Sequence, residues 1–383
     1  MDFSWTNEEL ELRDATIGFC RRHLGATDLD QRDRRSEFSH REWRLCAGQG
    51  LLGVTIPDEH GGMGQSPLVG ALLMEAFGYG SEDLGLAFSV AAHVFACAVP
   101  IAEFGTEEQK RHWLPLLASG EVIAAHSITE PEAGSDIFAM KTRADRVGDR
   151  YILNGTKCFA TNAPAANLFL VHAVTDPRKH FFGLDAFLVE ASTPGLVVGE
   201  PYEKVGLRTS PIGDIYLNDC VVPVSARLGG EGAGAPIFTV SMTWERTCLF
   251  AIYVGAMQRQ LEEAIAHARE RKQFGQAIGT FQAVGHRLVD MKVRLEAARL
   301  LLYKSAWNLT RGQDDPVDAA IAKLFVSEAA VQSALDAIQV FGGSGVVQGR
   351  IERYLRDAIP ARVFSGTSEI QRNNIARALG LGG

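Results

Sequence analysis

Apolar and polar residues recur with two different periods along the chain, and the change of period divides it into three parts. Residues 1–122 and 235–383 show mainly the three- to four-residue spacing of amphipathic helices. Residues 123–234 contain short apolar or alternating runs separated by proline and glycine, which is typical of β-strands. The pattern predicts an α+β protein with an N-terminal helical domain, a middle β-barrel or sandwich domain and a C-terminal four-helix bundle.

The N-terminal part carries clear helix-start signals. Thr6 precedes two glutamates, and Thr106 is followed three residues later by Gln109, which is the spacing of a capping box. The apolar stretch 84–102 is nearly as long as a membrane span, but a serine, His93 and a proline interrupt it. We therefore expect a buried helix there and no membrane association.

In the middle part, the dipeptide Asn154-Gly155 predicts a tight hairpin turn, because both residues tolerate positive φ angles. Further strands are expected from short apolar or alternating runs at 168–174, 186–190, 196–198 and 214–222.

The C-terminal part predicts long helices joined by short connections. One apolar face is formed by Leu288, Met291, Leu295, Ala298 and Leu302. Asp315-Pro316 supplies a cap and a first-turn proline for the next helix, which Gly342-Gly343 end. Its expected core stripe consists of Ile321, Leu324, Val331, Leu335 and Ile338.

Composition narrows the function classes. The net charge of −8 argues against nucleic acid as the main partner. The six cysteines are scattered and form no CxxC pair, so the sequence supports neither a metal site nor a disulfide framework, and a reducing cytoplasm fits best. The start of the chain, Met1-Asp2-Phe3, continues into an acidic stretch and does not have the pattern of a signal peptide.

Three segments carry candidate chemistry. The segment 128–136 combines small residues with hydroxyls, which let backbone N–H groups approach a phosphate or a ring closely. Arg271 in the segment 271–275 can neutralise a phosphate through two hydrogen bonds. Together with the segment 364–372, these motifs resemble the acyl-CoA dehydrogenase superfamily over essentially the whole chain. That resemblance implies FAD bound between the β domain and the bundle, in a homodimer or homotetramer.

The resemblance also implies which residues hold FAD. The loop residues and the second flavin-facing hydroxyl would be Ile128, Thr129, Gly134, Ser135 and Thr161, with Phe159 where the family often has tryptophan. A neighbouring subunit would be reached by Arg271, Phe274, Gln282, Gln339, Gly342 and Gly343. Thr367 matches a further flavin contact, whereas Glu369 stands where glutamine is common. Taken alone, these residues are equally a capped turn, a cation at a helix C-terminus and C-cap glycines.

Ser365 departs from the family pattern, because many members carry their catalytic glutamate at this position. Serine without a neighbouring base cannot remove the α-proton of an acyl thioester. A minority of the family places the glutamate at the position that matches Glu245, with Arg246 holding the region. The alternative interpretation of Glu245 is a glutamate at a helix start that the macrodipole or Arg246 stabilises.

A narrower resemblance is to flavin dehydrogenases that act on L-prolyl groups tethered to a peptidyl carrier protein. It rests on the segments 89–93, 134–137, 241–245 and 364–367. It implies oxidation of the prolyl thioester to pyrrole-2-carbonyl on the carrier, a loss of four electrons, as in pyrrole and antibiotic biosynthesis. Such a protein would have the carrier as its partner and oxygen or an electron-transfer flavoprotein as acceptor.

Two further features have competing interpretations. His93 either lines the acyl pocket or is a buried histidine with satisfied hydrogen bonds. The basic residues between Arg32 and Arg44 either dock an acidic carrier protein or form a solvated face, since acids interleave them. Rival functions are a short- or branched-chain acyl-CoA dehydrogenase, a flavin monooxygenase or oxidase of the same fold, and an inactive carrier-binding scaffold.

Overall fold

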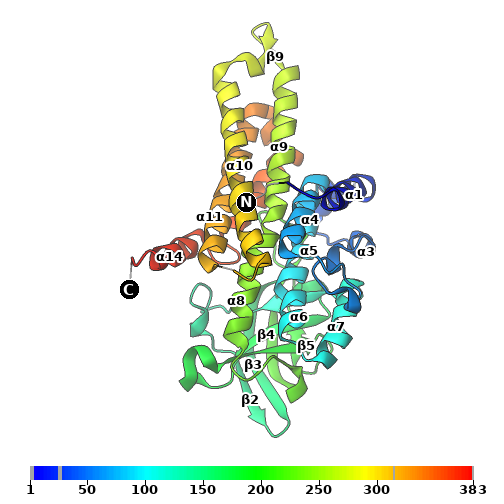
Figure 1. The fold of residues 1–383 in the computed structure, drawn as a ribbon, viewed down its shortest axis with the longest axis vertical. Coiled ribbons are helices and arrows are strands. Elements are labelled where there is room, and N and C mark those ends of the chain that lie inside the picture. The colour runs from blue at the N-terminus through cyan, green and yellow to red at the C-terminus, as the bar shows by residue number, and fades with distance from the viewer. Residues whose placement is uncertain (1–3, 25–27, 314, 382–383) are drawn as a thin grey trace.

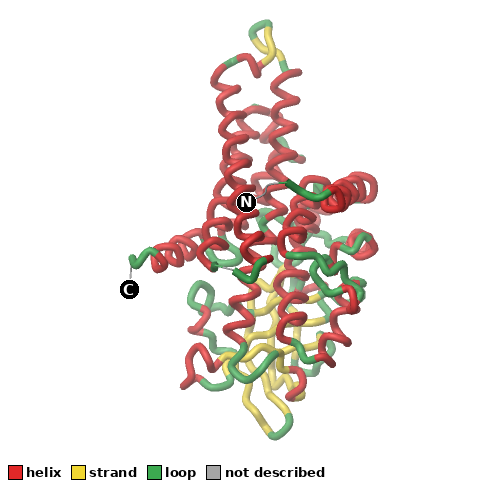
Figure 2. Tube along the Cα trace, in the orientation of Figure 1, coloured by secondary structure: helices red, strands yellow, loops and turns green. Residues whose placement is uncertain are grey.

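The computed structural model describes residues 4–24, 28–313 and 315–381. The expected outer ends of the first and last domains, at residues 1–3 and 382–383, lie outside these residues, as does the start of the chain at Met1. A sheet lies at one end of an elongated molecule and a bundle of long helices extends from it, with the N-terminal helices along one side (Figure 1). The predicted α+β order of helices, strands and helices is confirmed (Figure 2). The expected boundaries at residues 122 and 234 stay predictions.

The N-terminal helices begin where the sequence predicts. The Thr6 hydroxyl accepts a hydrogen bond from the Glu9 N–H, and Thr106 does the same for Gln109, so both capping boxes are present. The helices are α1 (Asn7–His23), α2 (Leu29–Arg35), α3 (His40–Gly48), α4 (Pro67–Gly80), α5 (Leu84–Ala92), α6 (Val99–Phe104) and α7 (Glu107–Ala118).

A π-helical segment, His93–Ala98, joins α5 to α6 into one apolar helix. This helix and α11 (Pro316–Phe341) are long and apolar enough to span a membrane, among the described residues. The most apolar window of Leu84–Phe104 is 94% buried inside the protein, however, whereas that of α11 is 50% buried. The first of them is therefore a core helix of the fold, as expected.

The middle domain is built on one eight-stranded mixed sheet of order β6-β7-β3-β2-β4-β5-β8, in which β1 also pairs with β4. The parallel β1–β4 pair matters most for the site, because it places His126 opposite Leu170, next to His172. The strands are β1 (Ala124–Ser127), β2 (Arg143–Val147), β3 (Arg150–Thr161), β4 (Leu168–Val174), β5 (Leu184–Glu190), β6 (Leu196–Val198), β7 (Ile212–Pro223) and β8 (Arg227–Leu228).

The predicted hairpin turn at Asn154-Gly155 is wrong. Both residues lie inside β3, and the real turn connects Val147 to Arg150 through Gly148. The register shifts between Leu153 and Gly155, where Asn154 faces both Asn218 and Asp219, so the dipeptide lies opposite a β-bulge of β7. The Asn154 side chain donates to Asp219 on β7 and accepts from its backbone N–H. A side chain with such a partner on the neighbouring strand stabilises a bulge instead of a turn.

The C-terminal part is dominated by α9 (Ala251–Glu270), α10 (Gln282–Thr310) and α11, which pack along one another (Figure 1). The predicted face of α10 is confirmed, since all its members are buried except the half-buried Leu288. The other elements are α8 (Gly234–Trp244), the hairpin β9 (Lys272–Gln273) and β10 (Gln276–Ala277), α12 (Gly343–Val346), α13 (Arg350–Ala358) and α14 (Ser368–Ala378).

The predicted core stripe of α11 is wrong. Its large apolar residues are only half-buried or, as for Leu335 at 45%, exposed. The buried face consists mostly of small residues, including Ala322, Val326, Ser333 and Ala337. Small side chains let α9 and α10 approach α11 closely. At this contact the size of a side chain matters more than its hydrophobicity.

Candidate active site

Glu245 does not start a helix. It opens the π-helical segment Glu245–Leu249, which joins α8 to α9 in one continuous rod. Its side chain is buried, and its Oε2 accepts a hydrogen bond from the Ser365 hydroxyl. A π-segment widens the helix locally and is frequent at functional sites. The interpretation of Glu245 as a helix-start acid is therefore wrong, because a mid-helix position receives no macrodipole stabilisation of that kind.

The loop that brings Ser365 to Glu245 is constrained from both sides. Ser365 and Gly366 have φ angles of +53° and +88°. The Ser365 carbonyl accepts hydrogen bonds from Arg246 Nε at 2.9 Å and from Gln371 Nε2 at 3.1 Å. A Cβ at Gly366 would lie 2.6 Å from Gln371 Nε2, so a side chain there would displace the loop. Arg246 thus holds the region, as the sequence suggested, by fixing the backbone of Ser365.

A pair of histidines lies on the other side of Glu245. His126 Nδ1 on β1 is 3.9 Å from Glu245 Oε1, and its Nε2 is 2.9 Å from Nε2 of His172 on β4. Burial lowers the pKa of His172 well below its usual value, and the charges of His126 and Lys157 lower it further. His172 is therefore neutral at physiological pH.

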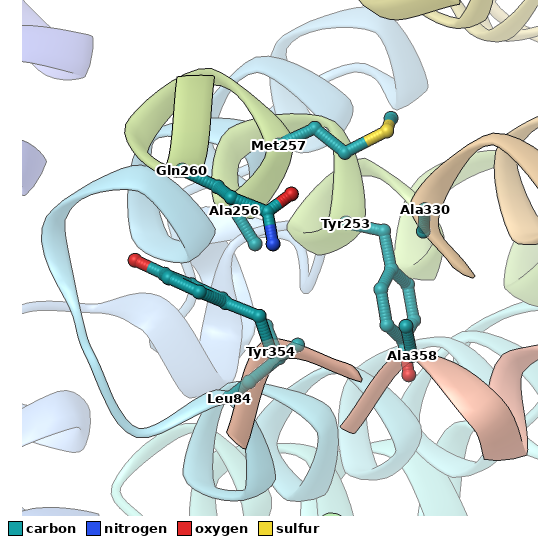
Figure 3. Close-up of a pocket in the computed structure, with 8 residues that line it drawn as sticks. All are labelled: Leu84, Tyr253, Ala256, Met257, Gln260, Ala330, Tyr354 and Ala358. Carbon is teal, nitrogen blue, oxygen red and sulfur yellow. The ribbon is translucent and has the colours of Figure 1, made fainter. Parts of the chain in front are cut away.

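Aromatic side chains close the space next to Ser365. The Phe364 ring lies 4.7 Å from that of Phe88 and 5.1 Å from that of Phe250, and Tyr253 packs on the same group. Behind Tyr253 lies a small separate cavity (Figure 3), lined by Leu84, Tyr253, Ala256, Met257, Gln260, Ala330, Tyr354 and Ala358. Of the four rings, only Tyr253 lines this cavity, and the other three pack between Ser365 and the core of the bundle.

The loop 128–136 is fixed by a buried ion pair. Glu130 Oε1 accepts from Lys157 Nζ at 2.7 Å and from the Thr142 N–H at 2.9 Å, and Lys157 also donates to the Ile128 carbonyl. Burial opposes ionisation of Glu130, but the charge of Lys157 and these donors hold its pKa below the usual value. Burial lowers the pKa of Lys157 to about 8. The loop is therefore rigid without any ligand.

The first group of expected FAD contacts lies together on the sheet side. Ile128, Thr129, Gly134, Ser135, Phe159 and Thr161 come from this loop and from β3. Phe159 is 63% exposed at a φ of +56°, and one face of its ring stacks on Tyr202 at 5.1 Å. Thr367 accepts from the Ile370 N–H as the cap of α14, next to the exposed Glu369. The Thr367 hydroxyl also interacts with the Glu369 carboxylate, whose pKa it helps to lower after the larger effect of the Glu369 backbone N–H.

The second group lies at the far tip of the bundle, at the end of Figure 1 opposite the sheet. Arg271 caps α9, Phe274 is 94% exposed in the β9–β10 hairpin, and Gln282 starts α10. Gln339, Gly342 and Gly343 end α11 beside them, because Phe341 stacks on His267 of α9 at 4.2 Å. A single chain therefore does not bring the two groups together.

Three glycines test whether these regions suit a large ligand. A Cβ added to Gly134, Gly342 or Gly343 would meet no atom of the described chain within 4 Å. Gly342 caps α11 at a φ of +60°, so its own backbone explains it. Gly134 and Gly343 have no such reason within the chain. Open space over the backbone at these two positions leaves room for a large ligand such as FAD to approach the main chain closely.

One of the two remaining alternatives from the sequence is also decided. His93 Nε2 lies 3.2 Å from the Leu117 carbonyl and its Nδ1 accepts from the Ala124 N–H, so it is a satisfied buried histidine. Burial lowers its pKa to about 4. Among the basic residues between Arg32 and Arg44, Arg32 is buried against Glu42 and Asp83, whereas the other arginines of the run are exposed. Docking of a carrier protein on this run stays a prediction.

Sequence reasoning missed His126, His172 and Lys157. Each is a polar residue within a predominantly apolar strand segment, and burial forces such a residue to find a partner. That signal was available for His172, inside the predicted strand 168–174. Nothing in the sequence says that β1 and β4 are neighbours, so the pairing itself was not predictable.

Comparisons with known proteins agree with this geometry. Residues 6–121, 125–220 and 232–380 match the N-terminal, middle and C-terminal domains of acyl-CoA dehydrogenases. An L-prolyl-[peptidyl-carrier protein] dehydrogenase of Pseudomonas fluorescens is 47% identical over 383 residues, covering 100% of both chains. One of a Serratia species is 45% identical over 386 residues, covering 100% of this chain and 99% of its own. The solved structure of PigA with FAD and proline has 44% identity and a TM-score of 0.97, with 100% of both chains covered. This chain therefore belongs to the acyl-CoA dehydrogenase family.

Proposed function

We propose that this protein is an FAD-dependent oxidoreductase that oxidises the L-prolyl group of a peptidyl carrier protein to pyrrole-2-carbonyl. The relatives named for this activity match the whole chain at 45–47% identity. The observation that carries the proposal is the buried Glu245 carboxylate, which the Ser365 hydroxyl holds beside the packed rings of Phe364, Phe88 and Phe250.

The residues present fit FAD in two places. The loop at Thr129 and Ser135, with Phe159 and Thr161, would face the flavin, and the bundle tip with Arg271 would bind a pyrophosphate. Because these groups are far apart in one chain, the proposal includes a homodimer or homotetramer in which the tip of one copy completes the site of another. These residues would hold FAD, which would supply the hydride acceptor for the β-carbon of the substrate.

Glu245 is proposed as the base. A carboxylate removes the weakly acidic α-proton efficiently only when it is positioned within hydrogen-bonding reach of that proton. Ser365 provides the positioning, since its hydroxyl donates to one carboxylate oxygen and leaves the other to face the substrate. Within the described residues the Ser365 N–H donates to no other group, so it is free to polarise the thioester carbonyl.

The partner and location follow from the same proposal. The thioester would be presented by a carrier protein, and the protein would act in the cytoplasm, with oxygen or an electron-transfer flavoprotein as acceptor. The carrier itself would be recognised by surface shape outside the pocket.

Anaerobic mixing tests the substrate. The flavin of the purified holoprotein should bleach rapidly with prolyl-carrier protein and slowly with butyryl- or isovaleryl-CoA. Mass spectrometry of the carrier after aerobic turnover should show the loss of four hydrogens. Bleaching only by the CoA esters would instead assign a short- or branched-chain acyl-CoA dehydrogenase, and a hydroxylated product a monooxygenase.

A further inference from the structure

Glu245, His126 and His172 form a continuous row of titratable side chains from three elements. Glu245 Oε1 faces His126 Nδ1 at 3.9 Å, and His126 Nε2 faces His172 Nε2 at 2.9 Å. The second distance is a hydrogen bond, so one of the two rings donates and the other accepts. The row begins at the oxygen that Ser365 does not occupy.

The protonation states are limited by burial. His172 is fully buried, and its Nδ1 meets no hydrogen-bond partner among the described residues. An uncharged His172 that accepts at Nε2 obliges His126 to carry its hydrogen on Nε2. The Nδ1 of a neutral His126 then presents a lone pair to Glu245. In this arrangement, which the proton transfer inferred below requires, the hydrogen bond to His172 sets the tautomer of His126.

The proposed reaction, on which this inference rests, requires such a neighbour. Converting a prolyl to a pyrrolyl group removes two hydrides and two protons in two rounds. Glu245 is neutral after it has taken the first proton, and a neutral carboxyl group cannot take a second. Glu245 must therefore lose this proton and become a carboxylate again while the thioester substrate is still bound.

We infer that His126 accepts the proton from Glu245 between the two oxidations and that His172 positions it for this transfer. In each round the Cα–H or equivalent ring C–H bond breaks and its proton goes to Glu245 Oε1. The O–H bond of Glu245 then breaks as the N–H bond forms at His126 Nδ1. Bound FAD would supply the acceptor for one hydride in each round, with oxygen or an electron-transfer flavoprotein taking its two electrons before the next round.

The products of this transfer stabilise each other. A Glu245 carboxylate and a His126 imidazolium are adjacent opposite charges, and the imidazolium still donates through Nε2 to His172. The 3.9 Å separation closes with a movement of about 1 Å to reach hydrogen-bonding distance. Other groups near the pair are Lys157 on β3, whose charge favours a neutral His172, and the ring of Phe238 on α8, 6.4 Å from that of His172.

Single-turnover mass spectrometry of the carrier-bound substrate separates the two rounds. In the His126→Asn variant, the first loss of two hydrogens should stay within about threefold of the unaltered protein. The second loss should slow by about tenfold or more, since a positioned proton acceptor contributes roughly 10²–10⁴-fold. The species lacking two hydrogens should therefore accumulate. The His172→Gln variant should also lower the rate of the second loss relative to the rate of the first.

His93→Gln is the matched control, because His93 is an equally buried histidine that contacts the backbone of β1 but not Glu245. It should leave the ratio of the two rates unchanged. Equal slowing of both rounds by His126→Asn would reduce His126 to a structural residue and overturn the inference. An unaltered protein that removes no hydrogen from the prolyl carrier would instead refute the proposed function.

A second measurement does not depend on turnover. Nitrogen-15 NMR of histidine-labelled protein reports which ring nitrogen carries hydrogen. Neutral His126 should carry its hydrogen on Nε2 and not on Nδ1. In the His172→Gln variant, both tautomers of neutral His126 should be present. Protonation of neutral His126 at Nδ1 would contradict the transfer, whatever the activity.

Discussion

The two halves of the candidate site are built in opposite ways. Around Glu245, three different elements fix every side chain by hydrogen bonds or packing, and the carboxylate is buried. At the bundle tip, Arg271, Phe274 and Gln282 are exposed on a short hairpin and on helix ends. The proposed catalytic residues meet within one chain, whereas the residues at the bundle tip that are proposed to bind FAD face solvent. Catalysis and cofactor retention should therefore respond differently to mutation.

The largest effect is expected in the half of the site around Glu245, called here the interlocked half. Glu245→Gln keeps the shape but removes the base, so turnover should fall by about 10³-fold or more, within the range for acid–base catalysis. FAD binding should not change. Stopped-flow bleaching and flavin absorbance measure the two properties. The control is Glu262→Gln, which alters an exposed glutamate on α9. Undiminished turnover of the Glu245→Gln variant would refute the proposal that Glu245 is the base.

The exposed half should show the reverse behaviour. Arg271→Ala should weaken FAD binding by about 10- to 100-fold, since a charge-assisted contact is worth roughly 1.5–3 kcal/mol. Turnover at saturating FAD should stay near normal. Fluorescence titration of apoprotein gives the affinity, with Arg269→Ala on the same exposed helix end as control. An unchanged affinity would mean that the tip does not hold FAD.

Within the interlocked half, Ser365→Ala isolates one hydrogen bond. Losing a bond to a charged group costs about 1.5–3 kcal/mol, so turnover should fall roughly 10- to 100-fold and less than in Glu245→Gln. The rate of flavin bleaching measures it. Ser368→Ala, which loses a bond to Glu328 instead, is the control. Equal losses in both serine variants would point to a general loosening of the loop.

The smallest effect concerns the aromatic boundary. Phe250→Leu should leave prolyl oxidation within about threefold but raise the rate with longer thioesters such as hexanoyl, because a smaller side chain opens space toward the neighbouring cavity. The ratio of the two rates is the measurement. The control is Phe187→Leu, which makes the same truncation on β5 of the sheet and should leave this ratio unchanged. A ratio that does not move would show that Phe250 does not limit acyl length.

The sequence predicted helix starts and strands well where the signal is local. The capping boxes at Thr6 and Thr106, the strand 168–174 and the face of α10 depend on neighbours within a few residues. It failed at Asn154-Gly155 and α11, where the partner comes from elsewhere. A bulge needs a facing strand, and the buried face of α11 is selected by how closely α9 and α10 approach.

The same distinction holds for the site. Glu245 and Ser365 could be identified because one motif lacks an acid and another supplies it. The pair of histidines could not, because His126 and His172 meet only through the pairing of β1 with β4. The role of His93 was open in sequence and was decided by its contacts with Leu117 and Ala124.

By itself, the sequence determined the order of helical and strand domains, the family resemblance and the residues able to carry the chemistry. These properties are encoded in periodicity and in short motifs, which need no knowledge of distant neighbours. Tertiary structure alone decided that Glu245 lies in a π-segment against Ser365, that two histidines extend from it, and that the bundle tip remains far from this centre. The pairs in contact are 46 positions apart for His126 and His172 and 120 for Glu245 and Ser365, and only the packing of the chain brings them together.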